Sequence, residues 1–387
     1  MNSRQLAILG AVTAAIILAA IWIGMPPKPA APSNAALYPQ LKGQLQNVTA
    51  VKTFAAGDTL AVQATRTKDG WTIEQRHDYP GDTAKINGLL LGLEDAKLHE
   101  EKTGNPDNYA TLGVEDLAKE KSGDHEAARV ELAGVAPTVN LIVGKTDATR
   151  AGSYVRRVGE KQSWLLDKQL AVPTDPTKWL RRDLLNIAAD RIHEAEVAIV
   201  GERRYDVVKA KRDDTNFDVT PIPRGRELNS VAAPNGIAQT LVNLQLDDVQ
   251  PAASLADKKG AAQTTFRTFD GLALDLTGYE IDGKYWITVK PSVDEALAKR
   301  YYIPPPAPDK SKDKAEDKGA SKNDDQGIKP VKDHSLEEAL SMRRDEVAAI
   351  AKQTSDWAYE LPQYKYEAIF KPLEQLLKKP ESFKKKK

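Results

Sequence analysis

The strongest pattern along the chain is one uninterrupted apolar run near its amino end, over residues 6–24. Arg4 precedes the run, and Lys28 is the first charged residue after it. About 19 residues at a rise of 1.5 Å per residue give a helix of roughly 28 Å, close to the hydrocarbon thickness of a bilayer. The run predicts a transmembrane anchor, with apolar side chains that include Leu6, Ile16, Ile17, Leu18, Ile21, Trp22 and Ile23.

Flanking charge predicts the orientation of this anchor. Positive residues stay on the cytoplasmic side of a membrane helix, so the short segment 1–5 with Arg4 is expected in the cytoplasm. The remaining chain is then periplasmic, in a single-pass protein of the inner membrane. Two alternatives remain open. A cleaved signal peptide would leave a mature protein that starts near Ala36, although its apolar core is normally shorter than this run. The second is a helix buried in a soluble domain, but helices that pack on such domains normally have a polar face, and this run is apolar on every face.

After the run, the pattern changes to short alternating segments that predict strands. The order begins with two strands, a third strand around Trp71, and a helix that starts at Thr83. The helix is expected to place on one face Ile86, Leu89, Leu90, Leu93 and Leu98. Three further strands are expected over residues 138–143, 153–158 and 162–166.

The same order recurs in the second half of the chain. Strands are expected over residues 194–200 and 205–211 and around Phe217, followed by a second helix. That helix repeats the spacing of the first through Ile237, Leu241, Leu244 and Val249. Three more strands are expected over residues 264–269, 272–277 and 284–289, which would make Trp286 the counterpart of Trp164. Runs of strands with one covering helix predict an α+β fold with mostly antiparallel sheets, in two repeated modules.

Composition divides the rest of the chain. Proline-rich residues 25–36 predict a stiff tether, and a Pro, Lys and Asp-rich stretch at 303–333, almost without apolar residues, predicts a disordered linker. Between them, the two α+β modules are expected at residues 37–180 and 181–302. Residues 334–387 are expected to form a helix-strand-helix module with a basic tail, able to supply a strand or helix to one of the larger modules.

Charge and cysteine content exclude several classes of function. Lys plus Arg and Asp plus Glu are 55 each, so no overall positive field would recruit nucleic acid. There is no cysteine, which removes disulfides and thiolate metal ligands. An exported chain without disulfides suits a bacterial periplasm.

No motif for catalysis, cofactor binding or metal binding stands out. The five histidines are scattered, without the i,i+4 pair of a helical metal site. Gly144-Lys145-Thr146 lacks the earlier glycine of a phosphate-binding loop and predicts a hairpin turn. The acidic pairs Glu94-Asp95 and Asp247-Asp248 are expected at helix ends, where adjacent side chains point apart. Buried packing is the default expectation for Trp71, Trp164, Trp179 and Trp286. The sequence therefore predicts no enzyme, no catalytic residue, no cofactor and no metal.

Several short segments together resemble a known bacterial family. They are WTI at 71–73, YPGD at 79–82, INGLL at 86–90, NYATLGV at 108–114, GSYVR at 152–156, QSWL at 162–165, Trp179 before RDLL at 182–185, and WAYELP at 357–362 with YK at 364–365. The chain is similar in these segments to the domain-of-unknown-function family 4340.

This resemblance implies one N-terminal membrane helix followed by a duplicated α+β region. Members are generally encoded beside ABC transporter subunits and a gliding-motility-type auxiliary protein. The implied partners are the transporter permease, the auxiliary subunits and inner-membrane lipid. No catalytic residue is established for the family, so none carries over. The leading hypothesis is therefore a membrane-anchored periplasmic accessory or scaffold protein of such a complex. The alternative is a periplasmic module that binds a lipid or glycan and hands it to a transporter.

Overall fold

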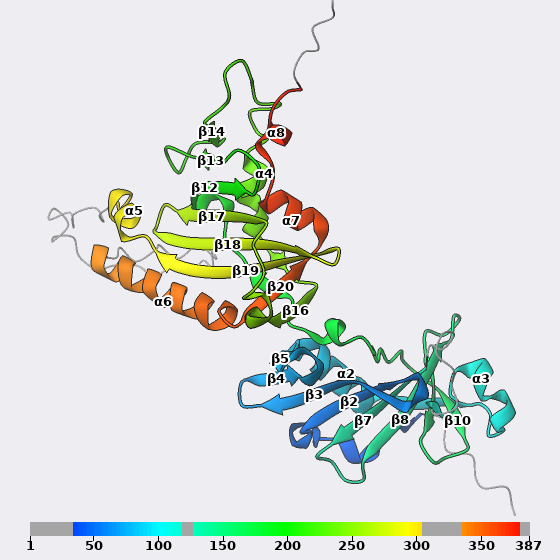
Figure 1. The fold of residues 1–387 in the computed structure, drawn as a ribbon. Helices are drawn as coiled ribbons and strands as arrows, with labels where there is room; N and C mark the ends of the chain where they lie inside the picture. Colours follow the sequence, from blue (N-terminus) through cyan, green and yellow to red (C-terminus); the bar gives the residue numbers. More distant parts are fainter. Residues whose placement is uncertain (1–33, 118–126, 304–334, 380–387) are drawn as a thin grey trace, which may run out of the picture. The chain divides into compact units, whose positions relative to one another are not determined.

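A computed structural model describes residues 34–117, 127–303 and 335–379, and the chain divides into two units, Met1–Trp179 and Leu180–Lys387. Both units consist mainly of antiparallel sheet with few helices, which confirms the predicted α+β class and antiparallel pairing (Figure 1). None of the helices in the described ranges is both long and apolar enough to span a bilayer. The predicted anchor at residues 6–24 lies outside the described residues, as do most of the predicted tether and linker.

In its described residues, the first unit is a ten-stranded sheet with two α-helices, α2 (Thr83–Asp95) and α3 (Tyr109–Leu112). Its strands are β1 (Ala35–Ala36), β2 (Ala50–Ala55), β3 (Thr59–Thr67), β4 (Gly70–Ile73), β5 (Tyr79–Pro80), β6 (Lys97–Glu101), β7 (Ala128–Ala133), β8 (Val139–Thr146), β9 (Ser153–Arg157) and β10 (Ser163–Leu166). They pair in the order β1-β6-β10-β9-β8-β7-β2-β3-β4-β5.

Helix α2 forms where the apolar spacing predicts it, but it is shorter than expected. Asp82 caps its start by accepting a hydrogen bond from the Lys85 N–H at 3.1 Å. The apolar face is buried against the unit, as expected for Ile86, Leu89, Leu90 and Leu93. The prediction that Leu98 continues this face is wrong. Ala96 is extended, and Leu98 lies in β6, where the backbone pairs with β1 and β10.

The second unit contains an eight-stranded sheet and a separate two-stranded ribbon. Its strands are β11 (Asp183–Leu185), β12 (Ile192–Ile199), β13 (Tyr205–Val208), β14 (Asp218–Thr220), β15 (Leu244–Gln245), β16 (Asp248–Pro251), β17 (Ala262–Thr268), β18 (Leu272–Ile281), β19 (Lys284–Val293) and β20 (Trp357–Leu361). Its helices are α4 (Asn235–Ala238), α5 (Glu295–Arg300), α6 (Leu336–Thr354), α7 (Gln363–Ile369) and α8 (Leu373–Leu376). The large sheet has the order β14-β13-β12-β17-β18-β19-β20-β16, and β11 pairs with β15.

The two large sheets share one pairing order. Reading from β4, the first sheet runs β4-β3-β2-β7-β8-β9-β10-β6, and the second runs β14-β13-β12-β17-β18-β19-β20-β16. The position of β10 in the first sheet is taken in the second by β20, which follows α6 near the carboxyl end (Figure 1). The predicted match of Trp164 with Trp286 is therefore wrong by one strand. Trp164 lies in β10, whereas Trp286 lies in β19, the counterpart of β9.

The second long helix expected from the sequence does not form. Only α4 and a 3₁₀ turn at Gln239–Leu241 are helical, and Leu244 and Val249 lie in β15 and β16. Asn243 has a left-handed backbone (φ 48°), which interrupts any helix at that point. The backbone after it pairs instead with β11 and β20. Tertiary strand pairing here overrides a helical spacing of apolar residues.

Candidate functional site

A cavity of about 710 Å³ lies in the second unit, where four segments of the chain meet. These segments are the loop after β13, the turn between β17 and β18, the end of α5, and the first half of α6. Most of its lining is apolar or aromatic, with side chains that include Phe269, Ala298, Tyr301, Leu336, Ala339, Leu340 and Met342. A volume of several hundred Å³ with an apolar lining is typical of a binding site for a small molecule.

Charged side chains line the same cavity. Lys211, Arg212 and Arg300 carry three positive charges and Asp213 one negative charge, so these four residues have a net charge of +2 (three minus one). Asp270 and Arg343 also line the cavity, but they bind each other and two further residues. The remaining cationic excess makes the rim suited to an anionic group.

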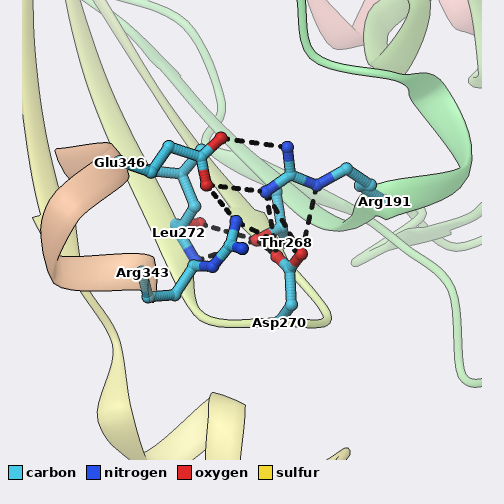
Figure 2. A network of polar contacts seen from close by, with 6 residues as sticks. All are labelled: Arg191, Thr268, Asp270, Leu272, Arg343 and Glu346. Atoms are coloured by element: carbon cyan, nitrogen blue, oxygen red, sulfur yellow. Dashed lines mark hydrogen bonds and ion pairs between the residues drawn. The ribbon is translucent and has the colours of Figure 1, made fainter. Parts of the chain in front are cut away.

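The polar network beside the cavity joins three elements (Figure 2). Arg191, just before β12, donates to Asp270 in the β17–β18 turn (Nε to Oδ2, 3.1 Å) and to Glu346 on α6 (Nη1 to Oε1, 3.0 Å). Arg343, also on α6, pairs with Asp270 at 3.4 Å and with Glu346. Thr268 contacts the Asp270 carboxylate and accepts a hydrogen bond from the Leu272 N–H at 2.8 Å.

These ion pairs attach a weakly buried helix to its sheet. Of the 19 residues in α6, only Leu340 and Thr354 are buried. The helix packs alongside β19 (Figure 1). Its Gln353 side chain donates to the Asp183 and Leu184 carbonyls at 3.1 and 3.2 Å. Because little apolar surface of α6 is buried, the two arginines and two carboxylates are a principal link between α6 and the rest of the unit.

The network favours the ionised form of Asp270. Burial opposes the charge of Asp270, but the Thr268 hydroxyl and the Arg191 and Arg343 guanidiniums outweigh it and hold the pKa of Asp270 below its usual value. Burial likewise opposes the charge of Arg191, and Glu346 and Asp270 reverse that effect and raise its pKa. A general acid or base needs a pKa near the working pH, and the pKa of Asp270 lies below its usual value. Its carboxylate is therefore better suited to a structural ion pair than to proton transfer.

His193 lies behind the aromatic part of the cavity wall. Its ring centroid is 4.9 Å from that of Phe269 and 5.0 Å from that of Tyr301, and both of these rings line the cavity. The His193 side chain is buried, and its Nδ1 has no hydrogen-bond partner among the described residues. Burial lowers the pKa of His193, which favours the neutral imidazole.

The other histidines do not join this site within the described residues. His77 is exposed in a left-handed turn (φ 55°), and His99 is exposed on β6. His125 and His334 lie outside the described residues. In the ranges that the structure covers, no group of three or more His, Asp and Glu side chains could hold a metal ion.

The two acidic pairs considered in the sequence analysis, and Asp206 on β13, have separate environments. Glu94, at the end of α2, accepts a hydrogen bond from the Gly43 N–H at 2.7 Å. The expectation that Asp247-Asp248 ends a helix is wrong, because Asp248 begins β16, and Asp247 pairs with Arg182 at 2.5 Å. Burial first, and Glu194 second, raise the pKa of Asp206 on β13. The structure does not bring these carboxylates together at the cavity.

The tryptophans and the glycine-lysine motif have structural positions. Trp71, Trp164, Trp179 and Trp286 are all buried, as predicted for core residues. Gly144-Lys145-Thr146 forms the end of β8, so the predicted hairpin turn is wrong. A Cβ on Gly144 would lie 2.3 Å from the Leu112 carbonyl oxygen, which explains why a glycine occupies this position.

Sequence reasoning missed the residues of the cavity and the network. Arg191 and Glu346 are 155 positions apart and meet only because α6 packs against the second sheet. A usable signal was Arg212 with Arg300 and the nearby Tyr301-Tyr302, since cations next to aromatic residues often form binding surfaces. No spacing rule joins these segments before the sheet is known.

Comparison with known proteins identifies the domain family. Residues 71–263, about half the chain, match the family described as Domain of unknown function (DUF4340). The chain belongs to this family. The DUF4340 match begins in β4 and ends in β17, so it includes Arg191 but stops before Asp270 and α6. No curated protein and no solved structure matches the chain.

Proposed function

We propose that this DUF4340 protein is a non-enzymatic accessory subunit of an ABC-transporter-type envelope complex. In this proposal, residues 6–24 anchor it in the inner membrane, and both α+β units lie in the periplasm. The partner class comes from the family, whose members are generally encoded beside transporter and gliding-motility-type auxiliary subunits. Anchoring confines the chain to the membrane surface and raises its effective concentration near such partners.

The observation that carries a binding role is the chemistry of the cavity in the second unit. Its lining is largely apolar, and the Asp270 and Arg343 side chains beside it are paired with each other and with Arg191 and Glu346. Ion pairs of this kind fix an element in place, whereas catalysis needs a group poised to exchange a proton. This arrangement favours recognition over chemistry.

The shared strand order supports two related modules. We interpret the two sheets as copies of one ancestral module, with β20 replacing a strand equivalent to β10. Strand addition at the sheet edges is a weak mode of docking here, because the edge strands β1, β5, β14 and β16 have only two to four residues. Loops and helix faces therefore offer the larger docking surfaces of the described chain.

The deciding experiment separates the anchor from the exported domains. A chain in which residues 1–24 are replaced by a cleavable signal peptide should lose function in a deletion strain while its abundance in the periplasm is maintained. Co-purification of the transporter subunits should fall with it. As the matched control, an unrelated transmembrane helix in place of residues 6–24 should preserve both. An active soluble form would refute the role of the anchor.

A scan of single residues tests the non-enzymatic part. Alanine at His77, His193, Asp206 or Glu227 should leave function within a few-fold of the parent chain, since loss of an essential catalytic group typically costs a factor of a thousand or more. Protein level and partner co-purification are measured in the same cells. One substitution that eliminates function while leaving both unchanged would show that the protein is an enzyme.

A further inference from the structure

Two arginines at the cavity share one aromatic platform. The Arg212 guanidinium lies 5.7 Å from the Phe269 ring centroid, and the Arg300 guanidinium lies 5.4 Å from that of Tyr301. The two rings contact each other edge to face at 4.9 Å. The Tyr301 hydroxyl also donates to the Ala210 carbonyl at 3.4 Å, which ties the end of α5 to the loop that carries Lys211 and Arg212.

These cations have no acidic partner in the described part of the chain. Neither Lys211, Arg212 nor Arg300 forms an ion pair with another described residue, whereas Arg191 and Arg343 nearby are both fully engaged. Like charges placed close together repel each other unless an anion joins them. Arginine guanidiniums also match the geometry of carboxylate and phosphate oxygens.

The rest of the cavity is suited to an apolar chain. Leu336, Ala339 and Leu340 present one side of α6 to it, and the apolar lining includes Met342 and Ile303, whose exposed fractions are 47% and 87%. Contiguous exposed apolar side chains occur at ligand-binding grooves, as well as at protein and membrane interfaces. The cavity volume of about 710 Å³ lies within the range of small-molecule binding sites.

We propose that this cavity binds an anionic amphiphile, namely an acyl chain that carries a carboxylate or phosphate head group. The head group binds at Arg212 and Arg300, with Lys211 adding charge, and the acyl chain lies against α6. The inference goes beyond the proposed accessory role and requires no partner protein. Its two sources, a free fatty acid and a phospholipid, share this chemistry and are separated by the choice of probe.

The test labels the full-length protein in membranes with photoreactive lipids. Two probes carry the same diazirine acyl chain, one as a free fatty acid and one in phosphatidic acid, and adducts are mapped by mass spectrometry. A third probe carries that chain on an uncharged glucoside. We expect adducts of the anionic probes on peptides containing Tyr301, Ile303 or Met342, and weak labelling by the glucoside. The stronger of the two anionic probes identifies the source.

Matched variants then test the charges and the cavity separately. Arg212→Ala with Arg300→Ala should reduce the adducts about tenfold or more, because two charge-assisted contacts are lost. As the control, Arg203→Ala with Arg224→Ala removes two exposed arginines elsewhere in the same unit. This control should change the amount of adduct less than twofold. Ala339→Trp fills the cavity without altering charge and should also reduce labelling. If the double alanine variant does not fold, Arg212→Gln and Arg300→Gln are tested singly.

Four results would overturn the inference. Adducts spread over other surfaces, labelling by the glucoside equal to that by the anionic probes, or labelling unchanged in the arginine variants would each contradict it. Binding of an acidic apolar peptide without any labelling of the cavity would assign the site to a protein segment instead. Co-purification of transporter subunits is scored in the same samples. If the parent chain is labelled at the cavity but no transporter subunits co-purify with it, the accessory role is contradicted and this inference stands.

Discussion

At the scale of single residues, Asp270 and His193 in the second unit both have lowered pKa values, for different physical reasons. Partial burial of Asp270 opposes its negative charge. Two guanidiniums and one hydroxyl beside the carboxylate outweigh that effect. The His193 ring packs against the rings of Phe269 and Tyr301, and its Nδ1 has no hydrogen-bond partner among the described residues. Cations and a hydroxyl lower the pKa of Asp270, whereas burial lowers the pKa of His193. In both cases the contribution of the group to folding stability is lost as the pH falls.

Asp270→Asn should weaken the attachment of α6. The loss of charge leaves Arg191 and Arg343 with one carboxylate, and we expect a local destabilisation of about 1–2 kcal/mol at neutral pH, because the pair is only partly buried. Since the folded-state pKa is below the ordinary value of 3.8, the carboxylate stabilises the fold above that pH, and the benefit is lost as the pH falls through the folded pKa. Hydrogen–deuterium exchange in α6 measures the effect. The difference in exchange between the variant and the parent chain should become smaller as the pH is lowered. Asp218→Asn, at an exposed position in β14, is the control, and equal exchange in both variants would contradict the prediction.

His193→Phe should remove an acid-sensitive contribution to stability. Burial lowers the folded-state pKa of His193 below the ordinary value of 6.5, so the unfolded chain binds its proton more tightly. The contribution is therefore complete above about pH 6.5 and is lost as the pH falls below it. Thermal unfolding at about pH 7.5 and at about pH 5.5 measures this contribution. Between the two pH values, the variant should lose less stability than the parent chain does. His99→Phe, at an exposed site, should behave like the parent. An identical loss in the His193 variant would contradict the burial argument.

At the scale of elements, α6 combines a well-formed start with little burial. Ser335 and Glu338 form a capping box, in which the Glu338 N–H donates to the Ser335 hydroxyl at 3.3 Å and the Ser335 N–H donates to Glu338 Oε2 at 2.8 Å. The first turn of the helix also contributes Leu336 and Ala339 to the cavity. The cap therefore positions one wall of the proposed site.

Ser335→Ala should loosen that wall without unfolding the unit. Loss of an N-cap hydroxyl typically costs about 1 kcal/mol, which corresponds to roughly a fivefold loss of exchange protection in the first turn of α6. Ser341→Ala, at an exposed position within the same helix, is the matched control and should leave protection unchanged or slightly raised, because alanine favours helix. Equal exchange in the two variants would show that the cap does not limit opening of the helix.

Elements with a local cause could be predicted, and elements with a distant cause could not. Alternation of apolar residues located β18 from Leu272 and β12 within two residues of its start, because one face of each strand is buried locally. The same method failed at Leu244 and Val249, whose helical spacing is overridden by pairing with strands near residues 183 and 360. The cavity was missed for the same reason, since Arg191, Asp270 and Glu346 converge only after the sheet and α6 have packed.

At the scale of the whole molecule, the second unit is assembled from two separate parts of the chain. Strand β20 lies between β19 and β16, so the sheet is complete only with the C-terminal segment. That segment also buries Ile369, Phe370 and Leu373 in the unit. Thr264 and Tyr205 donate to its Ile369 and Lys371 carbonyls at 3.0 and 2.6 Å. The first unit supplies the equivalent strand, β10, from the hairpin after β9.

Cutting the chain between these two parts should leave them associated. A site for a specific protease, inserted between Lys318 and Gly319 of the full-length protein, would separate β19 from β20 covalently while leaving the sheet intact. We expect the C-terminal fragment to co-elute with the remainder on a sizing column, because its strand pairs on both sides and its apolar side chains are buried. Ile369→Asp buries a carboxylate in that interface, and after cutting this variant should release the fragment. Exposed Tyr364→Asp is the matched control and should retain it. Release of the fragment from the cut parent chain would show that β20 depends on the covalent connection, and that the two parts do not form one stable sheet by themselves.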